Sequence, residues 1–154
     1  MNSEEQARKD LTQIFRAALE AVAPDRLTAM ALRGELDDAE TVPDIITAAR
    51  RVFVLAVGKA ASGMMVAAEQ HLGGRISDAV AVVPPADLEH DTDVRVARLH
   101  PGGHPLPDDN SIKAAQAVLT MLDGIGADDL LLGLLSGGAS AMVAAPADSV
   151  TLED

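Results

Sequence analysis

The residues best suited to chemistry form a glycine-rich turn near the end of the chain. The turn follows the apolar run 130–135 and covers residues 136–140. Consecutive glycines let a backbone bend sharply and approach a ligand closely. Free N–H groups at the start of a following helix attract an anion, and the helix dipole strengthens that attraction. The turn therefore predicts a phosphate or carboxylate site with donors at Ser136, Gly137, Gly138 and Ser140, although such turns can also be mere tight connections.

Neither serine of this turn fits a nucleophile motif. The elbow of a serine hydrolase needs G-x-S-x-G, but position 134 before Ser136 and position 142 after Ser140 are not glycine. Neither serine has a lysine three residues later, so a Ser-x-x-Lys pair is excluded as well. We therefore interpret both hydroxyls as hydrogen-bond donors to an anion.

A second candidate is the lysine that follows the apolar run 52–57. Gly58 and Lys59 stand where a buried strand should end and a helix should begin. An ammonium group at that point can neutralise a phosphate or carboxylate as a point charge. The stretch is not a Walker A loop, which would need glycine at Phe53 and serine or threonine at Ala60. The alternative is a surface lysine whose stem lies along the strand end, and the sequence favours neither reading.

The third candidate is the proline-rich loop 100–109, which contains His104 and Asp108. Its prolines and glycines predict a rigid, shaped connection. These side chains could orient a hydroxyl or bind Mg²⁺ through water, but for Asp108 and Asp109 we favour capping of the next helix over metal binding. Zinc is disfavoured because histidines four residues apart need a helix to converge, and the prolines forbid one. The sequence thus predicts no protein-bound metal.

The elements that must position these loops follow an α/β pattern. Uninterrupted apolar runs predict buried strands at 52–57, 79–83 and 130–135. Helical patterns follow at 60–72 and from Asp108 or Asp109 to about residue 123. This order predicts a three-layer α/β domain with a mostly parallel sheet. Ligands bind beyond the carboxyl ends of the strands in such sheets, so the loops could share one site.

The strand predicted at 94–99 decides whether the proline-rich loop joins that site. Ten residues with two prolines separate it from Val83, and a crossover between parallel strands usually needs about 10–12 residues or more. Either an extended connection makes the crossing, or the strand is antiparallel and loop 100–109 lies at the wrong edge of the sheet.

The first 41 residues predict helical structure and one exposed connection. Apolar side chains recur at helical spacing from Ala7 to Val22, so we expect this helix to pack on an apolar surface. A short second helix is predicted at 27–33, and the acidic segment 35–41 is predicted to be an exposed connection.

Composition excludes several classes of protein. The 154 residues are 48% apolar, with two Phe and neither Trp nor Tyr, so the core should be aliphatic. The absence of cysteine excludes disulfides and thiolate metal sites. A net charge of −12 disfavours nucleic acid as a partner. No signal-like core and no apolar span near the ~20 residues of a membrane helix occurs, so we expect a soluble, cytoplasmic protein.

Three stretches, in this order, resemble the N-terminal domain of the type-2 glycerate kinase family: VGKAASGM at 57–64, HPGGHPLPDDNS at 100–111 and DDLLLGLLSGGASAM at 128–142. The family reads AGHPVPDE where this chain has GHPLPDD at 103–109, and SGGGSAL where it has SGGASAM at 136–142. Ala139 in place of glycine is the main departure, because a Cβ would narrow the turn if that position needs positive φ.

The resemblance implies a Rossmann-like domain, incomplete at its C-terminal end, with 1–154 as the N-terminal part of the first domain and the second domain absent. It implies Mg²⁺- and ATP-dependent phosphorylation of D-glycerate to 2-phosphoglycerate in a cleft between two domains, and it allows a homodimer. Lys59 matches the active-site lysine of the family, and residues 136–140 match its glycine-rich loop. The family's other functional residues lie outside this chain, so we expect 1–154 alone to be nearly inactive.

Two alternatives remain open. One is a non-catalytic α/β module that binds a sugar acid or a sugar phosphate through the same loops. The other is an interaction protein that exposes an apolar surface and self-associates.

Overall fold

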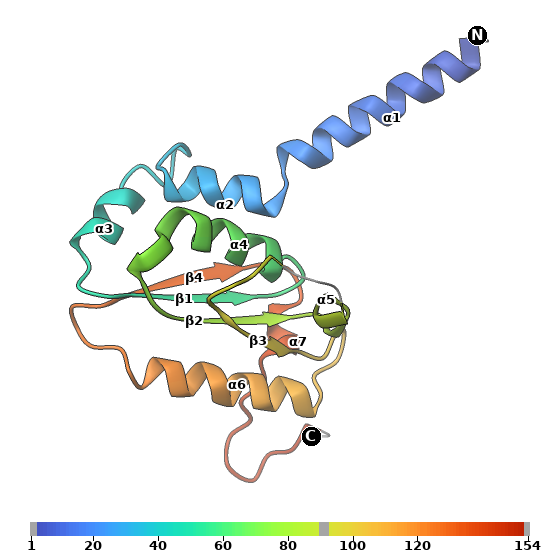
Figure 1. Cartoon of the computed structure of the whole chain (residues 1–154). Helices are drawn as coiled ribbons and strands as arrows, with labels where there is room; N and C mark the ends of the chain where they lie inside the picture. The colour runs from blue at the N-terminus through green and yellow to red at the C-terminus, as the bar shows by residue number, and fades with distance from the viewer. Residues whose placement is uncertain (1–2, 90–92, 153–154) are drawn as a thin grey trace.

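A computed structural model describes residues 3–89 and 93–152. In this part of the chain a sheet of four strands lies between helices (Figure 1). The strands are β1 (Val52–Val57), β2 (Ile76–Val83), β3 (Arg98–Pro101) and β4 (Leu130–Leu135). Their order is β3-β2-β1-β4, and every neighbouring pair is parallel. The predicted α/β class is confirmed, and the described sheet is entirely parallel.

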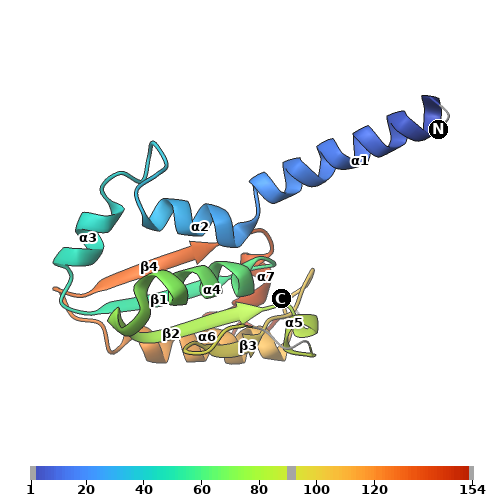
Figure 2. The same cartoon turned by 45° about the horizontal axis from the view of Figure 1, so that its top comes forward.

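Helices cover both faces of the sheet (Figure 2). One face carries α4, with α2 packed on it, and the opposite face carries α6. The helices are α1 (Ser3–Ala21), α2 (Pro24–Leu32), α3 (Val42–Ala48), α4 (Ala61–Leu72), α5 (Pro85–Glu89), α6 (Asp109–Leu122) and α7 (Ala139–Met142), with a 3-10 turn η1 (Gly73–Arg75). The short helices α3 and α5 were not predicted, because 7 and 5 residues are too few to show a clear apolar period.

Alternate side chains of β1 point into two separate cores. Val54 and Ala56 belong to the core under α4, whereas Phe53 and Val57 belong to the core under α6. Burial on both faces explains why this strand is a continuous apolar run without polar alternation. Both cores consist mainly of aliphatic residues and methionine, as the composition predicts.

The chain reverses its direction across the sheet between β1 and β4. From β1 it passes through α4 to β2 and then to β3, and α6 carries it back over the opposite face to β4 on the other side of β1. Connections that leave neighbouring strands toward opposite faces open a crevice at their carboxyl ends, where open α/β sheets bind ligands. The loops after β1 and β4 border this crevice.

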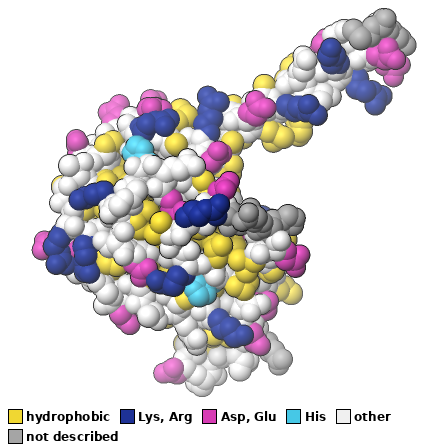
Figure 3. All heavy atoms as spheres, viewed as in Figure 1, with side chains coloured by type: hydrophobic (Ala, Val, Ile, Leu, Met, Phe, Trp, Pro, Cys, Tyr) yellow, Lys and Arg dark blue, Asp and Glu magenta, His cyan; other side chains and the backbone are white. Residues whose placement is uncertain are grey.

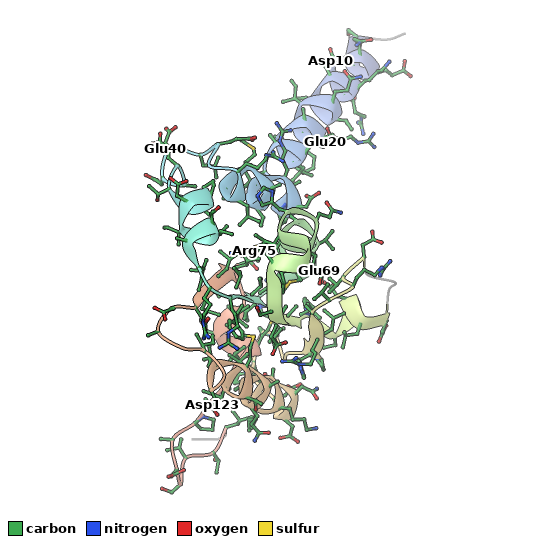
Figure 4. The ribbon with its side chains drawn as sticks, turned by 60° about the vertical axis from the view of Figure 1, so that its left-hand side comes forward. Asp10, Glu20, Glu40, Glu69, Arg75 and Asp123 are labelled. Atoms are coloured by element: carbon green, nitrogen blue, oxygen red, sulfur yellow. The ribbon has the colours of Figure 1, made fainter. Side chains whose placement is uncertain are left out.

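The third strand differs from its prediction in position and settles the open question of its direction. It covers Arg98–Pro101 instead of 94–99 and runs parallel to β2. Glu69 lies on α4 (Figure 4). Its carboxylate accepts the backbone N–H groups of Arg95, Val96 and Ala97, with nitrogen–oxygen distances of 2.7, 2.9 and 2.8 Å. These N–H groups therefore bond to a side chain, and loop 102–108 begins at the same edge as the other two loops.

Helix α1 does not pack as predicted. None of its residues is buried, and it extends away from the sheet (Figure 1). Its large apolar side chains lie along the exposed helix (Figure 3), and Leu11, Ile14 and Phe15 are each 63–67% exposed. The amphipathic pattern correctly predicts the helix, but the described residues do not cover its apolar side. No helix in this part of the chain is long and apolar enough to cross a bilayer.

An ion-pair cluster joins the amino ends of β1 and β4. The buried carboxylate of Asp129 accepts hydrogen bonds from Arg51 at 2.6 and 3.1 Å, from Arg50 at 3.2 Å and from the Gly126 N–H at 2.8 Å. These donors, chiefly Arg51, hold the pKa of Asp129 well below its ordinary value. The adjacent arginines thus have a structural partner at the edge of the sheet opposite to the candidate loops.

Candidate anion-binding site at the carboxyl edge of the sheet

The loops after β1 and β4 are joined by backbone contacts. The N–H of Lys59 donates to the carbonyl of Gly137 at 3.0 Å, and the N–H of Ser136 donates to the carbonyl of Val57 at 3.0 Å. A Cβ on Gly58, whose φ is +120°, would lie 2.7 Å from the carbonyl oxygen of Ser136. Only glycine permits both this conformation and this approach. The two predicted loops are therefore built as one unit.

The Ser136 hydroxyl lies between the two loops. Its oxygen accepts the N–H of Ala60 at 3.0 Å, at the start of α4. In the part of the chain that the structure describes, its hydrogen has no acceptor, so this hydrogen is available to a ligand. The contact supports the interpretation of Ser136 as a donor, with its oxygen held by the first turn of α4.

The Lys59 side chain lies beside the serine-glycine turn. Its Cγ is 3.5 Å from the position that a Cβ on Gly138 would occupy. Lys59 is exposed, and no residue within 3–89 and 93–152 forms an ion pair or a hydrogen bond with its ammonium group. The ammonium is thus free to meet an anion at the turn.

His104 reaches the same turn from the proline-rich loop. Its Cδ2 and Nε2 atoms lie 2.8 and 3.2 Å from the position of a Cβ on Gly138. Gly138 has φ +92°, and its missing side chain makes room for the imidazole. Lys59 and His104 therefore flank one glycine, although they are 45 residues apart in the sequence.

The departure from the family pattern at Ala139 does not narrow the turn. The residue with positive φ is Gly138, whereas Ala139 is the first residue of α7. A Cβ on Gly137 would meet no atom within 4 Å. The helix α7 is only 4 residues long, so its dipole adds little to the binding of an anion. Ser140 is exposed on this helix.

Asp108 caps α6, as we favoured. Its Oδ1 atom accepts the N–H groups of Asn110 at 2.9 Å and Ser111 at 3.1 Å. Direct contact between Asp108 and a ligand stays a prediction. In the described ranges no group of three or more His, Asp or Glu side chains could hold a metal ion. The ammonium, the imidazole, the hydroxyls and the backbone N–H groups suit an anion, and no ligand set for Mg²⁺ accompanies them.

The candidate site is a solvent-exposed group of hydrogen-bond donors beyond the carboxyl ends of β1 and β4. A nearby groove of about 310 Å³, which includes Leu55, Val57 and Leu135 in its lining, is apolar and lies beside the α6 face of β1 and β4. That groove does not suit an anion. The donors alone can bind a phosphate or carboxylate through charge and hydrogen bonds.

Comparison with known proteins places the chain in a family. A family model described as a domain of unknown function (DUF4147) matches residues 10–154. The chain belongs to this family. It is 35% identical over 150 residues to the D-glycerate 2-kinase of Thermotoga maritima, and 36% identical over 163 residues to the glycerate kinase of Bos taurus. These alignments cover 97% of this DUF4147 chain and 33% and 30% of the two relatives.

A solved structure supports the same relationship. The crystal structure of the Thermotoga maritima glycerate kinase matches with a TM-score of 0.76 and 36% identity, over 97% of this chain and 33% of that chain. The DUF4147 chain thus spans about a third of the length of the relatives it matches, and it is homologous to the N-terminal part of glycerate 2-kinases. The resemblance identified from the three stretches is confirmed.

The sequence reasoning missed two residues that hold the site together. A Cβ on Gly102 would lie 2.7 Å from the carbonyl oxygen of Met142, so this glycine lets the proline-rich loop touch the end of α7. Ser111 is fully buried and bonds to both ends of that loop. The spacing of Asp108 and Ser111 is a capping-box signal that could have identified the serine.

Proposed function

We propose that this chain carries the anion-binding part of a glycerate kinase site, and that the intact protein phosphorylates D-glycerate to 2-phosphoglycerate with ATP. The observation that carries the proposal is the convergence of Lys59 and His104 on Gly138, beyond the carboxyl ends of β1 and β4. The names of the related proteins supply the reaction class.

The residues of this chain would position and neutralise an anionic group. The Lys59 ammonium supplies charge, and the Ser136 hydroxyl and the N–H groups of the turn supply directed donors. ATP, when bound, supplies the phosphoryl group. Catalysis of phosphoryl transfer consists largely of positioning and charge stabilisation, so donors held by a rigid turn suit it. Mg²⁺ finds no ligand cluster in the described residues.

The chain alone should bind an anion weakly and turn over little. Its hydrogen-bond donors are exposed to solvent, which weakens their interaction with an anion. Each tenfold increase in rate requires about 1.4 kcal/mol of additional stabilisation of the transition state. Residues outside this chain would have to supply most of that stabilisation.

NMR titration of the ¹⁵N-labelled chain tests binding. D-Glycerate, inorganic phosphate and ATP with Mg²⁺ are added in separate titrations. We expect shifts at the amides of Lys59, Gly137 and Gly138, and none at Gly74 and Gly124. Gly74 lies just before β2 and the Gly124 carbonyl accepts a hydrogen bond from Arg51, so both lie at the amino edge of the sheet, opposite to the site. Shifts confined to other loops, or no shifts with any ligand, would contradict the proposed site.

A chimera tests the reaction. Residues 1–154 replace the matching third of the Thermotoga maritima D-glycerate 2-kinase. We expect ATP-dependent phosphorylation of D-glycerate by the chimera and a large loss of kcat in its Lys59→Ala version. Equal activity of the two folded chimeras would remove Lys59 from the reaction.

A second candidate is a binding module without catalysis, which the solvent-exposed donors of Lys59 and the serine-glycine turn would also suit. The same donors would then bind a sugar acid or a sugar phosphate tightly. Calorimetry combined with an assay of ATP consumption separates the two. A Kd in the micromolar range without turnover, in the chain and in the chimera, would support the module.

A further inference from the structure

Ser111 is a fully buried polar residue in the first turn of α6. Its Oγ atom accepts the N–H of Gly103 at 3.0 Å and the N–H of Asp108 at 3.2 Å. These two donors stand on either side of the loop 104–107, which contains His104. One hydroxyl therefore closes the loop by holding both of its ends.

The backbone of Ser111 holds the other half of the site. Its carbonyl accepts the N–H of Ala144 at 3.2 Å, just after α7. The residue before the closed loop, Gly102, packs against Met142, which is also fully buried. Ser111 is thus the point at which the proline-rich loop and the segment after β4 are tied to the same helix.

His104 depends on this closure for its position. Its side chain makes no hydrogen bond or ion pair with any residue in the ranges that the structure describes, yet it lies against Gly138. Its place therefore depends on the path of loop 104–107 and on the anchored residues before it, Gly102 and Gly103. We infer that Ser111 is a positioning residue for the anion site, and that it acts by holding His104 against the serine-glycine turn.

Loss of the hydroxyl should change the loop and not only the stability. Without Oγ, the buried N–H of Gly103 has no partner, and the loop must move to expose that group to water. The imidazole would then leave Gly138, while the turn formed by Lys59, Ser136 and Gly137 keeps its own contacts. A serine with a merely structural role would lower the melting temperature and leave the imidazole in place.

The test compares Ser111→Ala with Val118→Ala, which removes buried volume from the same helix about two turns further along. Val118 packs in the cluster that contains Met142, so this control also shows what a loss of packing beside α7 does by itself. The first readout needs no ligand: it is the NOE between the Hδ2 proton of His104 and the Hα protons of Gly138. We expect wild type and Val118→Ala to show this NOE and Ser111→Ala to lose it.

The second readout is the affinity for inorganic phosphate, measured by NMR titration. We expect Ser111→Ala to weaken binding roughly tenfold, with the His104 response lost and the Lys59 response retained, whereas Val118→Ala binds as wild type does. If Ser111→Ala does not fold, Ser111→Cys keeps the size and a weak acceptor. We expect Ser111→Cys to show a weaker NOE and weaker binding than wild type.

An unchanged NOE and an unchanged affinity in the folded variant would overturn the inference. The ligand readout also rests on the proposed function, but the two failures are distinguishable. If wild type shows no response to phosphate, the proposed site fails, and the NOE measured without ligand still decides the role of Ser111.

Discussion

The two ends of the β1–β4 strand pair are held together by different interactions. At the amino end, the carboxylate of Asp129 joins Arg50 and Arg51. At the carboxyl end, backbone contacts of Gly58, Lys59 and the 136–138 turn join the strands, and the cation is left without a partner among the described residues. The amino end uses its positive charges in ion pairs within the chain, whereas the Lys59 ammonium at the other end has no such pair among the described residues and, under our proposal, meets a ligand.

Composition makes this difference informative. The chain has 24 Asp and Glu residues against 12 Lys and Arg, yet no carboxylate among the described residues pairs with Lys59. Other basic side chains also lack an ion pair, but Lys59 differs from them in its place beside the serine-glycine turn. That arrangement would steer an anion to one edge of the sheet.

The largest effect on stability is expected for Gly58→Ala. The new Cβ would approach the Ser136 carbonyl in a φ +120° conformation, so strain and overlap together should cost about 2–5 kcal/mol. Urea unfolding measures the cost. Gly74→Ala is the matched control, because its Cβ would meet no atom within 4 Å. Equal costs at the two positions would show that the carboxyl end is not held by this contact.

Asp129→Asn should weaken the amino end by leaving the arginines without their charged acceptor. The folded-state pKa of Asp129 lies below its unfolded value, so its contribution is fully present above about pH 4 and is lost as the pH falls further. We expect lower stability at pH 7 and a shallower acid dependence of the free energy of unfolding. If the free energy of unfolding of Asp129→Asn depends on pH as that of wild type does, the ion pairs of Asp129 do not stabilise the amino end of the strand pair.

Gly138→Ala and Gly137→Ala should differ sharply although they are neighbours. At Gly138 a Cβ would press on His104 at φ +92°, whereas at Gly137 it would meet open space. We expect a cost of about 1–3 kcal/mol and weaker phosphate binding for the first, and less than about 1 kcal/mol for the second. Unfolding curves and phosphate titrations measure both. A larger loss of stability and affinity in Gly137→Ala than in Gly138→Ala would show that Gly138 is not the residue on which the shape of the turn depends.

Lys59→Ala should have the smallest effect on stability, within about 0.5 kcal/mol, because the side chain is exposed. Phosphate affinity should nevertheless fall roughly tenfold, because a charged donor is lost. Lys59→Arg, which keeps the charge, is the control and should retain most of the binding. A large loss of stability without a loss of affinity would make this lysine structural.

Local patterns predicted the bounds of the two uninterrupted apolar strands accurately, since β1 and β4 both have the predicted ends. Burial on both faces was predicted correctly only for β1. The prediction was wrong for β4, because this strand lies at the edge of the sheet and its residues Leu131, Gly133 and Leu135 are exposed. The third strand was predicted to begin four residues too early, since its pattern does not reveal that the Glu69 carboxylate accepts the N–H groups of residues 95–97. The predicted packing of α1 was wrong because apolar residues at helical spacing predict a helix, but they do not show which surface the apolar side contacts.

The sequence by itself determined the fold class, the three glycine- or proline-rich loops and the residues in them that suit an anion, since these follow from periodicity and side-chain chemistry close along the chain. Only the tertiary structure decided that β3 is parallel, that Lys59 and His104 meet at Gly138 and that Ser111 bonds to both sides of loop 104–107, which carries His104. These contacts join segments tens of residues apart, and their geometry depends on the direction and order of strands that no local pattern specifies.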